Sequence, residues 1–228
     1  APAVSLPIFH GARRMTAPDR FPTGSSVSAI RAGDPSTVTL AKAACRKLAL
    51  GRRGQLPPLA RIEAGLGLAE AADALGFPAG SVVSGFWPIR DEIDPRPLMD
   101  ALRVRGHPLC LPAIVGGDLV FRRLTRESEL VRAGFGTVEP PADAEELVPD
   151  CMLVPLAAFD TRGARIGYGR GYYDRAIAAI GARRGAPPMT VGIAFSVQQV
   201  EEVPEEAHDR RLQRILCETG FIDITENG

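Results

Sequence analysis

The chain has 228 residues, of which 45% are apolar, and its 27 basic residues balance 27 acidic ones. This length supports one sizeable hydrophobic core, and a net charge of zero gives no general attraction to nucleic acid or to an anionic membrane. No apolar run approaches the roughly 18 residues of a membrane-spanning helix, so the sequence predicts neither a nucleic-acid-binding protein nor a membrane protein.

The cysteines and histidines indicate no metal-binding or disulfide framework. No CxxC pair occurs among the four cysteines, which are Cys45, Cys110, Cys151 and Cys217. We therefore expect buried, reduced thiols and a cytoplasmic protein. The three histidines are too scattered for an HExxH motif.

The start of the chain differs in composition from the rest. Residues 1–36 are rich in Pro, Gly, Ser, Ala and Arg and lack a sustained apolar period. They are predicted to form a flexible N-terminal extension, followed by a single α/β domain over residues 37–228. The first helix is expected to begin at Ser36 or Thr37, and its apolar residues at helical spacing are Leu40, Ala44 and Leu48.

This first helix also carries both lysines of a chain that has 25 arginines. Lys42 and Arg46 are four residues apart and should project from one helix face. A lysine ammonium binds phosphate as a compact point charge, whereas arginine binds it as a planar fork. The pair therefore favours a phosphate site, although chance clustering of Lys42 and Lys47 is the simple alternative.

From residue 58 onward, helical and apolar extended segments alternate, as a parallel sheet with crossover helices requires. Helices are predicted over residues 59–75, 95–106 and 174–184, with a short helical turn at 196–200. Strands are predicted over residues 81–87, 107–115, 119–125, 150–159, 188–195 and 214–221. The expected fold class is α/β, with an open, mostly parallel sheet, helices on both faces and three α/β/α layers.

The most distinctive motif is FDTRGARIGYGRGYYD, residues 159–174, which connects an apolar strand to a helix. Such loops present backbone N–H groups to phosphate. The motif is not a Walker A loop, because Tyr172 follows Gly171, and it is not a dinucleotide fingerprint, because Gly171 follows Gly169 by only two residues. A nucleotide site is favoured by the neighbouring arginines and tyrosines, and a solvated Arg/Asp turn is the alternative.

Two further segments contain candidate site residues. Phe86, Trp87 and Glu92 could form an aromatic and acidic edge for a flat heterocycle; otherwise Trp87 is a core residue and Glu92 a surface acid. Asp209 could complete a Mg²⁺ site with Asp174, since Mg²⁺ commonly takes one or two carboxylates together with phosphate oxygens. The alternative for Asp209 is a solvated acidic turn.

The order of these segments resembles the 5-formyltetrahydrofolate cyclo-ligase family, also named methenyltetrahydrofolate synthetase. The resemblance extends from about Lys42 to the C-terminal strand, and its strongest element is LVPLAAFDTRGARIGYGRGYYDR. Supporting elements are AKAACR, FWPIRDEID, FGTVEP and QQVEEVPEEAHD. Departures from the family pattern occur at Leu124, Leu156, Arg211 and Gln213.

The resemblance implies a reaction and a set of site residues. It implies that ATP and Mg²⁺ drive conversion of 5-formyltetrahydrofolate to 5,10-methenyltetrahydrofolate, through phosphorylation of the formyl oxygen and attack by N10. ATP would be held by Lys42, Arg46, Arg165, Ile166, Gly167, Tyr168, Gly169, Arg170, Gly171, Tyr172 and Tyr173. The folate would be held by Trp87, Glu92, Tyr168, Gly169, Arg170, Gly171 and Tyr172. Catalysis would use Lys42, Arg170, Tyr172 and Tyr173, and Mg²⁺ would bind Asp174 and Asp209.

The expected partners are these small molecules alone, with no nucleic acid or membrane, and the expected state is a monomer. Two other function classes stay open. One is a nucleotide- or folate-binding protein on the same scaffold that lacks turnover. The other is a sugar-phosphate isomerase or an acyl-transferase-like enzyme, for which ATP would be idle.

Overall fold

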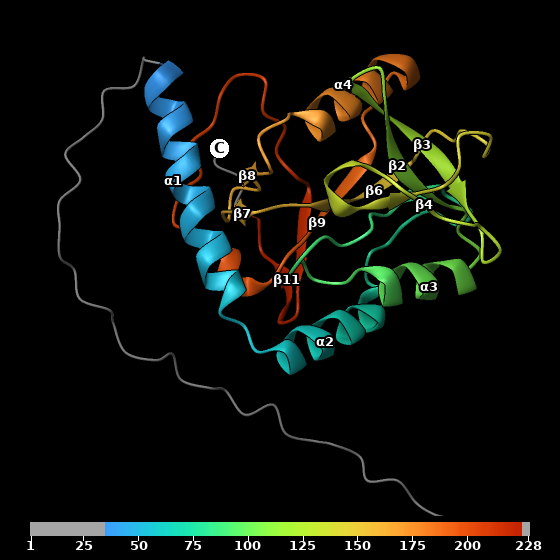
Figure 1. Cartoon of the computed structure of the whole chain (residues 1–228), viewed down its shortest axis with the longest axis horizontal. Coiled ribbons are helices and arrows are strands. Elements are labelled where there is room, and N and C mark those ends of the chain that lie inside the picture. The colour runs from blue at the N-terminus through green and yellow to red at the C-terminus, as the bar shows by residue number, and fades with distance from the viewer. Residues whose placement is uncertain (1–34, 225–228) are drawn as a thin grey trace, which may run out of the picture. The chain divides into compact units, whose positions relative to one another are not determined.

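The computed structural model describes residues 35–224 (Figure 1). The predicted flexible extension over residues 1–36 therefore lies outside the described residues, except for its last two residues. These two are helical, because helix α1 (Pro35–Gly54) begins at Pro35, one residue before the earliest predicted start. Proline suits the first turn of a helix, where its missing N–H has no partner to lose.

Three more α-helices follow, namely α2 (Pro58–Gly67), α3 (Arg96–Val104) and α4 (Tyr172–Arg184). Short 3₁₀ turns are η1 (Leu68–Ala71), η2 (Gly134–Gly136) and η3 (Ser196–Gln198). No helix among residues 35–224 is both long and apolar enough to cross a membrane.

The central sheet has seven strands in the order β11-β10-β9-β6-β1-β2-β3. Its strands are β1 (Val83–Ser84), β2 (Leu109–Val115), β3 (Asp118–Leu124), β6 (Cys151–Pro155), β9 (Met189–Ile193), β10 (Arg214–Cys217) and β11 (Gly220–Ile222). Strands β10, β9, β6, β1 and β2 run parallel, and the edge strands β11 and β3 pair antiparallel with their neighbours. The predicted mostly parallel sheet is confirmed.

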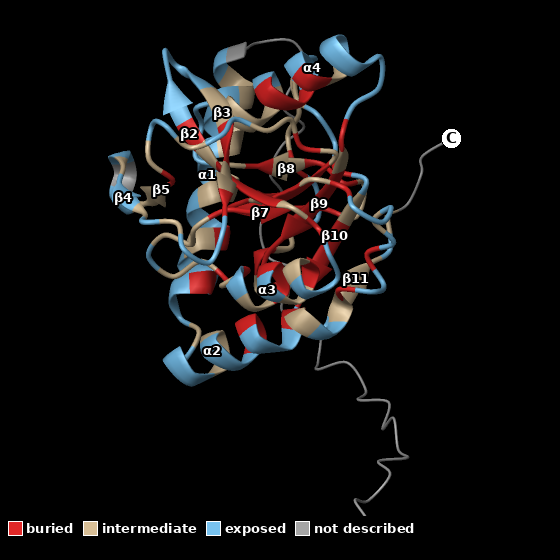
Figure 2. Ribbon diagram, turned by 90° about the vertical axis from the view of Figure 1, so that its right-hand side faces the viewer, coloured by how far each residue is buried: buried red, intermediate tan, exposed pale blue. Residues whose placement is uncertain are grey.

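Successive residues of each inner strand point to opposite faces of the sheet, and each face has its own core. Leu109 and Leu153 pack with η1 and α3 on one face, whereas the adjacent Cys110 and Met152 pack with α4 on the other. Figure 2 shows the buried sheet between α4 and the α2–α3 layer. The predicted three-layer arrangement with helices on both faces is thereby confirmed.

Helix α1 packs mainly against η3 and against a small hairpin outside the main sheet. The hairpin consists of β7 (Ala158–Phe159) and β8 (Arg165–Ile166), and Ala49 of α1 is buried against it together with Ala164 and Ile166. The helix predicted from the spacing of Leu40, Ala44 and Leu48 is present, but these leucines do not face the protein, because Leu40 and Leu48 are 71% and 51% exposed. The buried face of α1 instead carries small and basic residues.

Three predicted strands differ in extent from the observed ones. The segment 81–87 contributes only Val83–Ser84, and the segment 214–221 contains two strands joined by a tight turn. The predicted strand 150–159 ends at Pro155, and β7 then leaves the sheet to pair with β8. The glycine loop therefore follows this hairpin and does not follow a sheet strand directly.

Replacing Gly163 with alanine should lower the free energy of unfolding by about 3 kcal/mol. Gly163 lies in the turn between β7 and β8 at φ +79°, and an added Cβ would approach the carbonyl oxygen of Leu212 closely. Gly51→Ala is the matched control, because an added Cβ there meets no atom within 4 Å and alanine favours the helix. Urea unfolding of both variants checks the prediction, and equal stability of the two would contradict it.

Candidate active site

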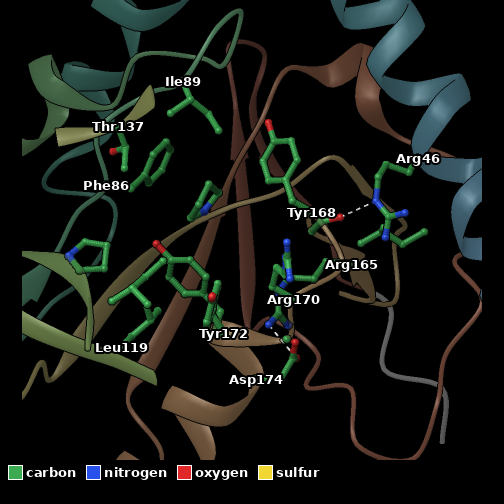
Figure 3. A pocket seen from close by; sticks show the side chains of 18 of the residues that line it. Arg46, Phe86, Ile89, Leu119, Thr137, Arg165, Tyr168, Arg170, Tyr172 and Asp174 are labelled. Atoms are coloured by element: carbon green, nitrogen blue, oxygen red, sulfur yellow. Dashed lines mark hydrogen bonds and ion pairs between the residues drawn. The ribbon is translucent and has the colours of Figure 1, made fainter. Parts of the chain in front are cut away.

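A cavity of about 1000 Å³ lies at the carboxyl ends of strands β1, β2 and β6. Figure 3 shows Arg46, Arg165 and Asp174 on one side of it and Phe86, Ile89 and Leu119 on the other. The charged side comes from α1, the β7–β8 hairpin and the loop before α4. The apolar side comes from the segments after β1 and from the β2–β3 hairpin.

Lys42 of α1 is held between two carboxylates of the segment after β9. Its Nζ donates to Glu206 Oε2 at 2.7 Å and to Asp209 Oδ2 at 2.5 Å. Burial disfavours the ammonium, but the hydrogen bonds to Asp209 and Glu206 outweigh this effect and raise the pKa of Lys42. The same contact lowers the pKa of Asp209 despite its partial burial. A fixed positive charge therefore faces the cavity at neutral pH.

The glycine loop lies beside this charge and leads into α4. Arg46 Nε donates to the carbonyl oxygen of Gly167 at 2.7 Å, which ties the loop to α1 (Figure 3). Gly169 and Gly171 have φ values of +85° and +62°, which L-residues with side chains rarely adopt. No side chain caps the first turn of α4, so its backbone N–H groups and helix dipole are available to an anion.

A second cationic group lies at the start of α4. Arg165 Nη2 donates to Asp174 Oδ1 at 2.8 Å, and the backbone N–H of Arg210 donates to the same oxygen at 3.1 Å. The Arg165 side chain is only 5% exposed. Asp174 is thus placed beside the segment that carries Asp209, with one carboxylate oxygen already occupied by these two donors.

The two tyrosines at the start of α4 differ in environment. Tyr173 packs against the core on the α4 side of the sheet, and burial raises the pKa of its phenol. Tyr172 lines the cavity next to Arg175, whose guanidinium carbon lies 5.2 Å from the centre of its ring. Arg175 also donates to the carbonyl oxygens of Arg170 and Gly117, which connects the glycine loop to the β2–β3 turn.

The apolar side of the cavity contains an acid. Glu92 Oε1 accepts a hydrogen bond from the Tyr168 hydroxyl at 2.7 Å, and Oε2 accepts one from the Ile89 backbone N–H at 2.9 Å. Burial raises the pKa of Glu92, and these hydrogen bonds offset only part of that effect. Phe86 is buried and Trp87 is half-buried along the same wall. An aromatic and acidic surface therefore faces the basic side.

All fifteen residues that the family resemblance implies as site residues line this one cavity. Their individual roles stay predictions. The side chain of Ile166 packs into the core beneath α1, so a contact with ligand would involve its backbone. Glu92 lies at the cavity and is not a solvated surface acid.

Sequence reasoning missed several lining residues. Glu206 and His208 flank the predicted Asp209, and the ligand atoms of these three residues lie within 4.8 Å of one another. The stretch VPEEAHD gave the signal, but only the structure shows that Glu206 binds Lys42 whereas Glu205 binds Arg211. The segment around η2 was also missed; it contributes Ala133, Gly134, Thr137, Val138 and Glu139.

The 5-formyltetrahydrofolate cyclo-ligase family model matches residues 38–218 of this chain. The 5-formyltetrahydrofolate cyclo-ligase of Escherichia coli K12 is 33% identical over 141 residues, which are 59% of this chain and 76% of that protein. The protein of the same name from Haemophilus influenzae is 32% identical over 132 residues, covering 55% of this chain and 69% of that protein.

Two solved structures have a similar fold. The NMR structure of the Aquifex aeolicus 5,10-methenyltetrahydrofolate synthetase has a TM-score of 0.68 at 27% identity, and the match covers 82% of this chain and 94% of that chain. A 5,10-methenyltetrahydrofolate synthetase from Mycoplasma pneumoniae has a TM-score of 0.59 at 22% identity, covering 76% and 96% of the two chains.

Proposed function

This chain belongs to the 5-formyltetrahydrofolate cyclo-ligase family, and from that premise we propose that its cavity converts 5-formyltetrahydrofolate to 5,10-methenyltetrahydrofolate at the expense of ATP. The observation that carries the proposal is that one glycine loop joins the two sides of the cavity. We call the charged side, with Lys42, Arg46 and Arg165, the basic wall, and the side with Trp87 and Glu92 the aromatic and acidic wall. A cavity of this kind can bring a phosphate donor and a flat heterocycle together.

The reaction needs an activated formyl oxygen, because a formamide oxygen is a poor leaving group. The formyl oxygen attacks the γ-phosphorus of ATP, and the bond from that phosphorus to the bridging oxygen breaks to release ADP. N10 then adds to the formyl carbon and loses its proton. The C–O bond breaks, inorganic phosphate departs, and the methenyl bridge between N5 and N10 remains. Such chemistry depends on positioning and charge neutralisation more than on a nucleophilic side chain.

We assign the basic wall to the triphosphate. Lys42 and Arg46 extend from one face of α1, and Arg165 reaches the same region from β8. The uncapped first turn of α4 adds backbone N–H donors and a positive dipole end. Together these groups stabilise negative charge as it redistributes during phosphoryl transfer.

We assign the aromatic and acidic wall to the folate. Trp87 offers a flat surface for stacking, and the carboxylate of Glu92 accepts hydrogen bonds from amino and ring N–H groups. Tyr168 belongs to both sites, because its hydroxyl binds Glu92 while its neighbour Gly167 is bound to Arg46. Tyr172 and Arg170 then lie where the two substrates would meet, and the partly buried Tyr173 supports that loop.

The residues present fit a magnesium ion. Glu206, His208 and Asp209 place ligand atoms within 4.8 Å of one another, and Asp174 is held beside them through the N–H of Arg210. Mg²⁺ prefers carboxylate oxygens, so we propose Asp209 and Asp174 as its protein ligands. When bound, Mg²⁺ would neutralise phosphate charge. The ammonium of Lys42 balances the charge of the Asp209 carboxylate.

We further propose that the enzyme works as a monomer in the cytoplasm. The four cysteines are free thiols, three of them buried, as a reducing compartment favours.

The proposed activity is tested by mixing the protein with 5-formyltetrahydrofolate, ATP and Mg²⁺ and following the absorbance of the methenyl product. We expect product formation that stops when ATP is omitted and when EDTA removes the divalent cation. Trp87 is the only tryptophan of the chain, so its fluorescence reports binding separately. Quenching by 5-formyltetrahydrofolate without any product would favour the non-catalytic binding protein, and the absence of both signals would reject the folate assignment.

A further inference from the structure

We propose that Arg53 is a positioning residue for the folate: through Tyr168 and Asp91 it fixes the carboxylate of Glu92 at the cavity wall. This inference rests on the proposed function, in which Glu92 receives the N–H groups of the heterocycle. Arg53 itself does not line the cavity.

The first step is the burial of Arg53. Its side chain extends from the last turn of α1 into the protein and is 2% exposed. Its Nη2 donates to Asp91 Oδ1 at 2.6 Å and to the Tyr168 hydroxyl at 3.2 Å. A buried guanidinium is unfavourable unless its partners compensate it, so a role confined to surface solubility does not explain this residue.

The second step is the direction of the Tyr168 proton. A guanidinium only donates hydrogen bonds, so the Tyr168 oxygen accepts from Arg53. The single hydroxyl proton of Tyr168 is then free to point at Glu92, whose Oε1 lies 2.7 Å away. Arg53 therefore selects one orientation of the hydroxyl, and this orientation fixes one oxygen of Glu92. The remaining lone pairs of Glu92 stay available for a ligand.

The third step concerns the turn over residues 89–92, which carries Glu92. Glu92 donates its backbone N–H to the carbonyl oxygen of Ile89, and between them Arg90 adopts φ +55°. A non-glycine residue in this region is strained and persists only where its surroundings hold it. Asp91, the next residue, is held by Arg53. The ion pair between α1 and this turn thus supports a strained segment of the cavity wall.

The charges around Glu92 give the arrangement a measurable consequence. The ionisable groups that act on it are Tyr168, Tyr173, Asp91 and Arg53, and Arg53 is the cation among them. Burial raises the pKa of Glu92, and Arg53 counteracts that rise. The carboxylate form of Glu92 binds the N–H donors of the folate. The affinity for the folate is therefore present at pH values above this pKa and is lost as the pH falls through it. Without Arg53 the loss should begin at a higher pH.

The test compares Arg53→Met and Arg53→Lys with Arg52→Met. Arg52 is the neighbouring arginine of the same helix turn, is exposed, and donates to the carbonyl oxygen of Gln199 outside this network. Binding of 5-formyltetrahydrofolate is measured without ATP, from Trp87 fluorescence, as a function of pH. Steady-state kinetics give KM and kcat separately, and circular dichroism checks that each variant is folded.

For Arg53→Met we expect the Kd and KM for the folate to rise about tenfold at neutral pH, with kcat changed less than about threefold. The pH at which half of the affinity is lost should move upward. Arg53→Lys should show the same two changes to a smaller extent, because it keeps the positive charge. Arg52→Met should match the natural protein. If Arg53→Met does not fold, Arg53→Lys alone should still raise Kd with an upward pH shift.

Two results would overturn the inference while leaving the proposed function intact. One is an Arg53 variant that turns over and binds folate with an unchanged Kd and pH profile. The other is a weaker affinity whose pH profile does not move, since that would assign Arg53 a structural role only. Absence of folate binding by the natural protein would instead overturn the proposed function itself.

Discussion

Replacing Lys42 with methionine is expected to lower kcat/KM for ATP about 1000-fold, a loss of about 4 kcal/mol in transition-state stabilisation. Lys42 Nζ is the ammonium held between Glu206 and Asp209 at the basic wall of the cavity. Methionine keeps most of the length and apolar stem of the side chain but removes its charge. The change leaves the carboxylates of Glu206 and Asp209 without their cation at the place where phosphate would bind. Repulsion between these carboxylates and the phosphate then adds to the loss of the attraction by Lys42.

The chain supplies its own control for this variant. Lys47 is the only other lysine, lies on the same helix and is exposed. Lys47→Met removes the same charge from α1 at a position away from the cavity and should leave kcat/KM for ATP within about twofold of the natural value. Initial rates of methenyl product formation over a range of ATP concentrations measure both variants. Equal activity of the two lysine variants would remove Lys42 from the ATP site.

Thermal unfolding separates this effect from a loss of structure. The side chains of Lys42 and Asp209 are 14% and 18% exposed, so breaking their ion pair also reduces stability. The kinetic prediction therefore applies to the folded variant at a temperature well below its midpoint. A variant that is folded and fully active would contradict the assignment, whatever the change in its melting temperature.

The sequence predicted the sheet and the cavity because both follow from local patterns. Predominantly apolar runs such as 151–155 and 189–193 are typical of strands that are buried on both faces of a sheet. The glycines of the loop before α4 mark positive φ angles, and Gly169 and Gly171 adopt them. The order of elements then brings strand ends, loop and helix start to one edge of the sheet.

The errors share a physical cause, which is that contacts with other segments override local propensity. Leu40 and Leu48 of α1 have helical spacing, yet α1 turns its basic face inward because the β7–β8 hairpin and the acidic residues near 206–209 receive it. The strand predicted over 150–159 ends early because β8 pairs with its second half. The partners of α1 are more than 100 residues away in the sequence, whereas β8 follows β7 closely in a hairpin that the apolar run up to Phe159 does not reveal.

The network around Arg53 was beyond sequence reasoning for the same reason. Arg53, Asp91 and Tyr168 come from three separate segments, and a stretch such as LALGRR predicts exposed arginines at the end of a helix. Of the adjacent pair, Arg52 is exposed and Arg53 is buried. A rotation of α1 by one residue would exchange the two arginines, and the contacts of α1 with η3, with the β7–β8 hairpin and with Glu206 and Asp209 set that rotation.

Replacing Asp174 with asparagine should lower kcat/KM for ATP about 100-fold at limiting Mg²⁺ and should raise the Mg²⁺ concentration needed for half-maximal rate. Asparagine keeps the shape of the side chain and an oxygen that can accept from Arg165 Nη2 and from the N–H of Arg210. It removes the negative charge, which is the part of the side chain that a hard cation requires. The fold should be retained, since both hydrogen bonds can still form.

Asp118→Asn is the matched control for this variant. Asp118 also forms an ion pair with an arginine, Arg175, but is 71% exposed and does not line the cavity. Rates measured over a range of Mg²⁺ concentrations at fixed ATP distinguish two roles for Asp174. If it holds the cation, high Mg²⁺ restores much of the lost rate. If it only orients Arg165, the rate stays low at every Mg²⁺ concentration, and the metal site must then be sought among Glu206, His208 and Asp209.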